Sequence, residues 1–289
     1  MINLLFTGND KIVDGLSLAL ISIANHCKEP LNVIVLTMDL QEIKPEYKCI
    51  KEEHLANLVN HLQSVNPESR LKVIDITEIF KEKNKDSVNM DNMYSPYAFI
   101  RLLADEVEEV PDKVIYLDID ILANGDIKEL WDIDVSNVEY GAARDYYGKI
   151  FISPRYINSG VMLLNMAMIR HTKLFEKCRH FVNTKKAAFP DQTALNKFVE
   201  KRIIIPGKFN SQRRLREGDI IRHFCKSIRF YPSVKRRSNP VKKHCRNYPK
   251  YFPIFHTLNI KSWDKHGVQN VLGCRAFDNV YEKYEEIKK

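Results

Sequence analysis

The sequence predicts an α/β fold built on a largely parallel β-sheet. Short apolar segments alternate with helical segments along the first half of the chain, which is the order that produces parallel strands joined by crossover helices. The apolar segments are hydrophobic on both faces rather than alternating, as expected for strands that helices cover on both sides. The first strand also runs into a polar, glycine-containing loop, and ligands bind at such strand ends in this class of fold.

The first half of the chain contains three expected strands and two expected helices. The expected strands are residues 2–6, 32–37 and 71–76, and the expected helices are residues 13–26 and 45–63.

The second half opens with a helix over 95–107, because Ser95 is a good N-cap residue and Pro96 suits the first helical position. Residues 112–122 then form an expected strand that ends at the turn Asn124-Gly125. The remaining expected elements are strands at 139–145 and 158–166 and helices at 166–183 and 191–200.

The composition is that of a globular protein with a basic surface. The chain has 289 residues, 44% hydrophobic and 28% charged, with a formal net charge of +8, so anionic partners are favoured. None of the six cysteines forms a C-x-x-C pair, which argues against a zinc ribbon or a thioredoxin-like site. We expect no signal peptide and no membrane span, and therefore reduced thiols in a cytoplasmic protein. The G-x-G-x-x-G and P-loop patterns are absent, which argues against dinucleotide oxidoreductases and P-loop NTPases.

Two aspartates interrupt the apolar segment IYLDIDIL (115–122). In a regular strand, Asp118 and Asp120 point to the same side, with Cβ atoms about 6.6 Å apart. Neighbouring buried carboxylates repel each other, so the pair needs a shared proton, basic partners or a divalent cation. A bend at the end of the strand would let both carboxylates reach one ion. The alternative is an ordinary strand end with two solvated aspartates.

The segment YLDIDIL (116–122) resembles the D-x-D motif of the family-8 retaining glycosyltransferases. Further segments resemble that family in the same order, from Leu4 to about Trp263: FTGND (6–10), GAARD (141–145), YINSGVMLLN (156–165), FPDQTALN (189–196) and FHTLNIKSW (255–263). The resemblance implies a GT-A type nucleotide-sugar-binding fold. That fold is a mixed, mostly parallel sheet flanked by helices, here with a basic C-terminal segment.

The resemblance also implies how the donor is held. The FTGND loop would contact the uracil of a UDP-sugar, and Arg101, Asp145 and Asn158 would lie near the sugar. The expected donor-binding residues are Thr7, Gly8, Asn9, Asp10, Arg101, Asp118, Ile119, Asp120, Asn158, Ser159 and Lys261. Taken by themselves, Asn9 and Asp10 are more simply explained as residues of an ordinary β-to-α turn.

The expected catalytic residues are Gln192, Asp191 and Asp145. Because a glutamine is a poor nucleophile, Gln192 is expected to stabilise developing positive charge through its carbonyl dipole. This favours attack on the face that UDP leaves, without a covalent glycosyl-enzyme. The plainer interpretation of Asp191 is a first-turn acid stabilised by the helix dipole.

The expected metal ligands are Asp118, Asp120 and His256, the last of them implied by the resemblance. A mixed set of oxygen and nitrogen ligands suits Mn²⁺ better than Mg²⁺, which remains the alternative. Without the resemblance, His256 would be an ordinary core or surface histidine.

The chain departs from the family pattern in two places. In the terminal segment, Asn259 and Ser262 replace a glycine and a proline, and Lys261 follows His256 one residue sooner. The phosphate contacts of that segment are therefore in question. In the first loop, Ile12 stands where the family commonly has a tyrosine.

We therefore expect a Mn²⁺-dependent retaining glycosyltransferase. It would move a hexose from UDP-glucose or UDP-galactose to a glycan or glycolipid acceptor of lipopolysaccharide, capsule or another cell-surface glycan. The GT-A domain is expected over 1–265 and a helical tail over 266–289. Within the domain, the basic, aromatic-containing segment 201–250 would face the acceptor or contact the inner face of the membrane peripherally.

Two alternatives remain open. The altered 255–263 segment is compatible with an inactive nucleotide-sugar-binding protein. The basic segment 201–250 is compatible with a nucleic-acid-binding protein, although nucleic acid is the less favoured partner.

Overall fold

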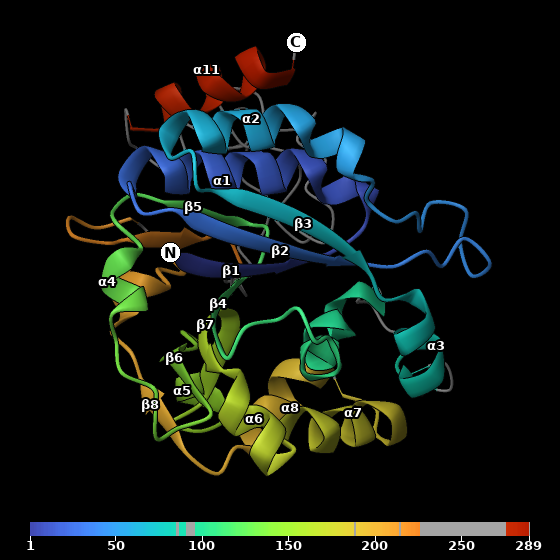
Figure 1. Ribbon diagram of the computed structural model, residues 1–289. Coiled ribbons are helices and arrows are strands. Elements are labelled where there is room, and N and C mark those ends of the chain that lie inside the picture. The colour runs from blue at the N-terminus through green and yellow to red at the C-terminus, as the bar shows by residue number, and fades with distance from the viewer. Residues whose placement is uncertain (85–86, 91–95, 188, 214, 226–275, 289) are drawn as a thin grey trace, which may run out of the picture.

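A mixed β-sheet forms the centre of the molecule (Figure 1). The computed structural model describes residues 1–84, 87–90, 96–187, 189–213, 215–225 and 276–288. Within them, a seven-stranded sheet has the strand order β3-β2-β1-β4-β7-β6-β8. Its strands are β1 (Ile2–Thr7), β2 (Leu31–Thr37), β3 (Arg70–Asp75), β4 (Lys113–Leu117), β6 (Tyr140–Arg144), β7 (Ile157–Asn165) and β8 (Arg202–Ile204).

The sheet has a parallel part and an antiparallel part. Strands β3, β2, β1 and β4 run parallel to one another, and β8 is parallel to β6. Strand β7 runs antiparallel to both of its neighbours, β4 and β6. The predicted mixed, mostly parallel sheet is therefore confirmed.

Helices cover both faces of the sheet (Figure 1). One face carries α1 (Val13–His26), α2 (Ala56–Val65) and α11 (Ala276–Lys288). The other carries α3 (Thr77–Asn84), η3 (Pro96–Glu106), α6 (Met166–Thr172), α7 (Leu174–Thr184) and α8 (Pro190–Phe198). Residues 15–24 of α1 are all buried, because the helix lies between the sheet and the α2 and α11 helices.

The predicted strand over 112–122 is broken in two. Strand β4 ends at Leu117, and β5 (Ile121–Ala123) leaves the main sheet to pair antiparallel with β9 (Ile221–His223). The backbone N–H of Ala123 donates to Ser22 Oγ at 2.9 Å, which holds this two-stranded ribbon against α1. The bend therefore lies in the segment that contains Asp118 and Asp120, before the Asn124-Gly125 turn.

Two predicted helices also differ from the structure. Residues 45–51 are not helical, and the helical segment starts with η2 (Glu52–Leu55). The carbonyl of Lys48 instead accepts a hydrogen bond from the backbone N–H of Asp10 at 3.0 Å, which pins this segment to the loop after β1. The predicted helix over 166–183 is divided into α6 and α7 at Lys173, whose φ of 56° is left-handed.

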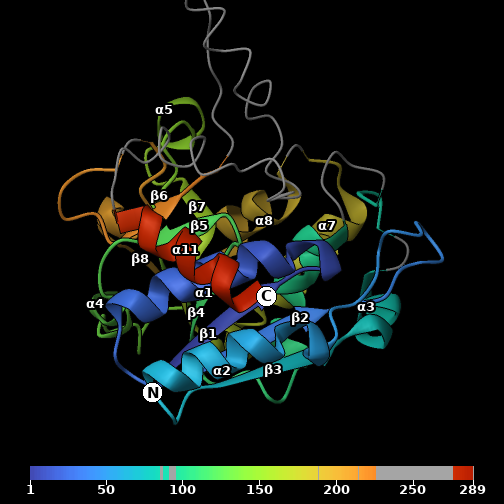
Figure 2. The same ribbon diagram turned by 90° about the horizontal axis from the view of Figure 1, so that it is seen from above.

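The remaining short elements are η1 (Asp10–Ile12), α4 (Lys128–Trp131), α5 (Gly148–Phe151) and η4 (Gly207–Phe209). Figure 2 shows α5 at the periphery, away from α1 and α2. Among the described residues, none of the helices is long and apolar enough to cross a bilayer.

Candidate active site

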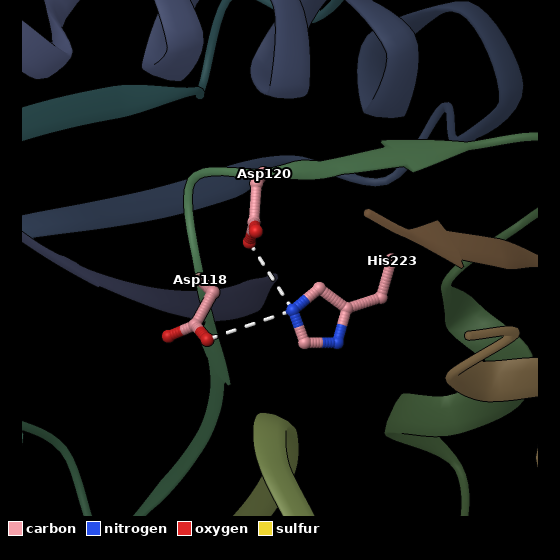
Figure 3. A group of neighbouring side chains, drawn as sticks. All are labelled: Asp118, Asp120 and His223. Atoms are coloured by element: carbon pink, nitrogen blue, oxygen red, sulfur yellow. Dashed lines mark ion pairs between the residues drawn. The ribbon is translucent and has the colours of Figure 1, made fainter. Parts of the chain in front are cut away.

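Asp118, Asp120 and His223 meet at the bend between β4 and β5 (Figure 3). His223 Nε2 lies 3.1 Å from Asp120 Oδ1 and 3.6 Å from Asp118 Oδ2. The β5–β9 ribbon creates this meeting, because its register places His223 opposite Ile121, the residue after Asp120. Between the two aspartates, Ile119 packs against the hydrophobic core.

The donor set of this cluster fits a divalent cation. One ligand atom from each of the three residues lies within 4.8 Å of the others. The distances of 3.1 and 3.6 Å from His223 Nε2 to the two carboxylates are close to the separation of about 3–3.5 Å between atoms that share one cation through bonds of about 2.1 Å. Two carboxylates and one imidazole form a mixed oxygen and nitrogen set. Chemistry and spacing therefore both agree with a metal centre.

The two carboxylates affect the proton affinity of His223. Burial lowers the pKa of His223, but Asp120 and Asp118 outweigh that effect and the pKa is raised. Only the neutral imidazole can bind a metal, so a cation at this position would compete with a proton for the ring nitrogen. The two aspartates that attract the proton are also the ones that would share the cation.

Hydrogen bonds fix the orientation of the His223 ring. Asn158 Oδ1 accepts from the backbone N–H of Gly160 at 3.0 Å, so it must be the carbonyl oxygen of that amide. Asn210 Nδ2 donates to the same Asn158 oxygen at 2.9 Å, which turns Asn210 Oδ1 toward His223. His223 Nδ1 lies 3.0 Å from Asn210 Oδ1 and must carry the hydrogen. The lone pair of neutral His223 is therefore on Nε2, facing the aspartates.

Gly160 leaves the space in which these side chains meet. A Cβ atom at this position would lie 2.7 Å from His223 Nε2 and 2.8 Å from Asp118 Oδ2. Both distances are far below an ordinary contact. The site therefore requires glycine here for room rather than for an unusual backbone conformation.

Arg101 connects the cluster to two further elements. Its Nη2 donates to Asp118 Oδ1 at 2.8 Å, and its Nη1 donates to the carbonyl of Ser159 in β7 at 2.6 Å. Its Nε lies 3.3 Å from Asp191 Oδ2 at the start of α8. Burial raises the pKa of Asp191, and Arg101 opposes part of that rise. Tyr116 also donates to Asp118 Oδ1, at 2.8 Å, so Oδ2 is left to face His223.

Gln192 lies beside Asp191 and is oriented by β7. Its Oε1 accepts from the backbone N–H of Ser159 at 3.1 Å and lies 3.3 Å from Ser159 Oγ. Asp145 belongs to the same region, because its Oδ2 accepts from Asn158 Nδ2 at 3.1 Å. The structure thus brings together the residues predicted from the middle segments of the sequence.

The loop after β1 reaches the cluster through Tyr116, whose hydroxyl lies 3.3 Å from Thr7 Oγ1. Asn9 is buried, and within the described residues the buried Oδ1 of Asp10 makes no hydrogen bond. Ile12 packs closely on Gly8, since a Cβ on that glycine would lie 2.6 Å from Ile12 Cδ1.

His223 is not among the site residues predicted from the sequence. The available signal was the short apolar run Ile220-Ile221 before it, which is typical of a strand. Two of the predicted residues, His256 and Lys261, lie outside the described residues together with about half of segment 201–250. Their roles stay predictions.

The Glycosyl transferase family 8 model matches residues 3–244. The chain belongs to glycosyl transferase family 8. The match includes the two aspartates and His223, and it ends before His256.

Curated family-8 relatives share a moderate part of the chain. A Haemophilus influenzae protein named as a glycosyltransferase is 22% identical over 72% of this chain and 62% of its own length. The Escherichia coli lipopolysaccharide 1,2-glucosyltransferase is 30% identical over 41% of this chain and 40% of its own length. The Salmonella typhimurium lipopolysaccharide 1,3-galactosyltransferase is 28% identical over 41% of this chain and 40% of its own length. The matched region therefore spans less than two thirds of each of these relatives.

Solved structures share the fold. The galactosyltransferase LgtC, in complex with donor and acceptor sugar analogues, superposes with a TM-score of 0.58 at 19% identity, covering 78% of this chain and 87% of LgtC. The bifunctional glycosyltransferase WbbM superposes with a TM-score of 0.61 at 18% identity, covering 78% of this chain and 46% of WbbM. The fold is of the GT-A type, as the resemblance implied.

Proposed function

We propose that this family-8 protein is a Mn²⁺-dependent retaining glycosyltransferase. It transfers glucose or galactose from a UDP-sugar to a glycan acceptor of lipopolysaccharide, capsule or another cell-surface glycan. The observation that carries the proposal is the cluster of Asp118, Asp120 and His223, whose imidazole presents Nε2 to both carboxylates. The named relatives that act on lipopolysaccharide support the acceptor class.

In this proposal Asp118, Asp120 and His223 hold the cation. The bound ion supplies Lewis-acid stabilisation of the diphosphate leaving group. The resemblance to the family implies His256 as the third metal ligand. In this proposal His223 provides an imidazole ligand, either in place of His256 or in addition to it. Lys261 remains the proposed second source of positive charge for the phosphates.

The residues around the cluster hold the sugar and the base. Arg101, Asp145, Asn158 and Asp191 would contact the hexose, directly or by orienting one another through the contacts described above. The loop of residues 7–10 would contact uracil. The buried Oδ1 of Asp10 supports this, because a buried acceptor without a hydrogen bond costs free energy that an N–H group of the base would recover.

Gln192 would stabilise positive charge at the anomeric carbon. Its side chain is held by Ser159, so its amide dipole is oriented before the donor binds. This arrangement supports attack on the face that UDP leaves rather than a covalent intermediate on Gln192.

The decisive experiment measures UDP release from a panel of UDP-sugars, with and without Mn²⁺, in the presence of candidate glycan acceptors. Release that depends on Mn²⁺ and falls at least about 100-fold in Asp118→Asn supports the proposal. Asp132→Asn, an exposed aspartate at the end of α4, is the matched control and should behave as wild type. Manganese-independent release, or full release by Asp118→Asn, would contradict the proposed role of the cluster.

A second comparison separates the two candidate histidine ligands. We expect His223→Asn to abolish Mn²⁺ binding, measured by calorimetry, because its ring nitrogen faces both aspartates. If His256→Asn binds Mn²⁺ normally, His223 is the sole imidazole ligand. If only His256→Asn loses the metal, His223 has a structural role.

The two alternatives have distinct signatures in the same samples. An inactive nucleotide-sugar-binding protein would bind UDP without releasing it from any UDP-sugar. A nucleic-acid-binding protein would show polynucleotide affinity that falls steeply with salt and does not depend on Mn²⁺.

A further inference from the structure

Three consecutive apolar side chains stand exposed at the outer end of α5. Ile150, Phe151 and Ile152 are 63%, 65% and 61% exposed, and they follow directly on the Asp145 region. Other strongly exposed large apolar residues in the described part of the chain, such as Ile43 and Val88, lie far from these three in sequence. A contiguous apolar patch at the surface of a globular protein marks an interaction site. We call residues 150–152 the apolar tip.

Cationic and aromatic side chains surround the apolar tip. Lys149 Nζ lies 5.2 Å from the centre of the Tyr146 ring, and the Arg213 guanidinium lies 4.3 Å from the same ring. Arg155 is exposed just beyond the tip. No aspartate or glutamate occurs from Tyr146 to Tyr156, so the whole protrusion is positive.

This combination selects the kind of partner. Apolar side chains at a tip can enter the acyl boundary of a bilayer, while aromatic rings and long cationic side chains remain at headgroup level. Basic residues near an anionic membrane surface add attraction. A protein partner that covered only the apolar residues would not use the surrounding positive charge.

The apolar tip is fixed rigidly to the candidate active site. Asp145 Oδ1 accepts hydrogen bonds from the backbone N–H groups of Tyr147 at 3.1 Å and Gly148 at 2.6 Å. Its other oxygen accepts from Asn158, the residue that also orients the Asn210–His223 pair. A Cβ on Gly148 would overlap the Tyr156 ring, so α5 is packed tightly on the residue that precedes β7. If a surface binds the apolar tip, Asp145 is therefore held at a fixed distance from that surface.

We propose that the apolar tip inserts into the surface of an anionic phospholipid bilayer, with Lys149, Arg155 and Arg213 against the headgroups. This contact is separate from segment 201–250, apart from Arg213. The inference goes beyond the proposed function, because vesicle binding requires neither donor nor acceptor and can succeed or fail independently of sugar transfer.

The first test is co-sedimentation of the full chain with phosphatidylcholine vesicles, with and without phosphatidylglycerol. We expect binding only to the anionic vesicles, and an affinity about tenfold or more lower for the Ile150→Ser/Ile152→Ser double variant. The matched control is Ile43→Ser, because Ile43 is also exposed, at 45%, but lies on a different loop. Unchanged affinity of the double variant would overturn the proposal.

A second measurement detects insertion directly and is independent of any binding by segment 201–250. A tryptophan introduced as Ile150→Trp should be quenched by lipids that carry a spin label high on the acyl chain. The wild-type signal from Trp131 and Trp263 is subtracted. Ile43→Trp should show no such quenching. If the tryptophan introduced by Ile150→Trp is unquenched, the tip does not enter the bilayer and the proposal is overturned. If the double variant loses self-association instead of vesicle binding, the tip contacts another protein copy and not a membrane.

Discussion

Two buried arginines, Arg101 and Arg179, each lie between two carboxylates, but only Arg101 belongs to the candidate active site. Arg179 pairs with Asp105 and Glu106 and also donates to the carbonyl of Leu102. All three of these partners belong to η3, so Arg179 fastens α7 to a single neighbouring element. Its side chain is 6% exposed, and it is enclosed by these acceptors.

Arg101 instead joins three elements at one point. Its partners are Asp118 after β4, Ser159 in β7 and Asp191 in α8. Its Nε makes no hydrogen bond within the described residues, and the Asp118 side chain remains 27% exposed. A buried arginine between carboxylates therefore does not by itself indicate an active site. The active site is indicated instead by side-chain atoms that can still bind a ligand, which here belong to Asp118 (Oδ2), Asp120 and His223.

The largest expected effect comes from breaking the cluster of Arg179, Asp105 and Glu106, which we call the structural cluster. Arg179→Met should lower the free energy of unfolding by about 3–5 kcal/mol, because Asp105 and Glu106 lose their buried partner. Urea denaturation measures the loss. The UDP release per folded molecule should stay near the wild-type value. A normal stability with impaired release would show that Arg179 acts on the site after all.

Arg101→Lys should lower UDP release more than it lowers stability, the reverse of Arg179→Met. A lysine keeps the charge but loses the planar fork that reaches Asp118 and Ser159 together. We expect UDP release to fall about 100-fold, which corresponds to about 2.7 kcal/mol of transition-state stabilisation. Arg179→Lys is the matched control for the chemistry of the substitution and should affect stability rather than release. Equal losses of release in both variants would remove the distinction between the clusters.

Asn210→Ala tests the orientation of the His223 ring. Loss of the Asn210 carbonyl leaves the ring free to present either nitrogen to the aspartates, and residues that orient metal ligands contribute about 10–100-fold to metal affinity. Calorimetric titration with Mn²⁺ measures this affinity. Asn137→Ala, an exposed asparagine, is the control. Unchanged Mn²⁺ affinity in Asn210→Ala would mean that Asp120 alone orients the ring.

The smallest expected effect is a pH dependence of the structural cluster. Burial raises the pKa of Asp105, and Arg179 opposes this rise. Because the folded protein binds the Asp105 proton more tightly than the unfolded chain, the contribution of this group to stability increases as pH falls through its raised pKa. Wild type should therefore gain stability relative to Asp105→Asn on acidification, by at most about 1.4 kcal/mol per pH unit. A constant difference across pH values would contradict this assignment.

Local signals in the sequence predicted much of the fold. The apolar runs of β1 and β2 identify strands that are buried on both faces, and Pro96 marks the start of η3 correctly. The break between β4 and β5 could not be predicted, because the alternation of Asp118, Ile119 and Asp120 is also that of a regular strand. The chain bends there only because β5 finds a distant partner, β9.

The same long-range pairing explains what was missed at the site. Asp118 and Asp120 were conspicuous because two charges interrupt an apolar run. His223 follows an arginine in a basic region and has no such contrast. Its role depends on strand register and on the Asn210 hydrogen bond. Both are properties of the folded chain.

The pairing of β5 with β9 also determines when the cluster can form during synthesis of the chain. Asp118 and Asp120 leave the ribosome long before His223, and domains begin to fold from the N-terminus as they emerge. A polypeptide released before β9 carries the complete pair of aspartates and most of the sheet, but not the imidazole that completes the cluster. The three-residue cluster can therefore form only after the chain has been synthesised past residue 223.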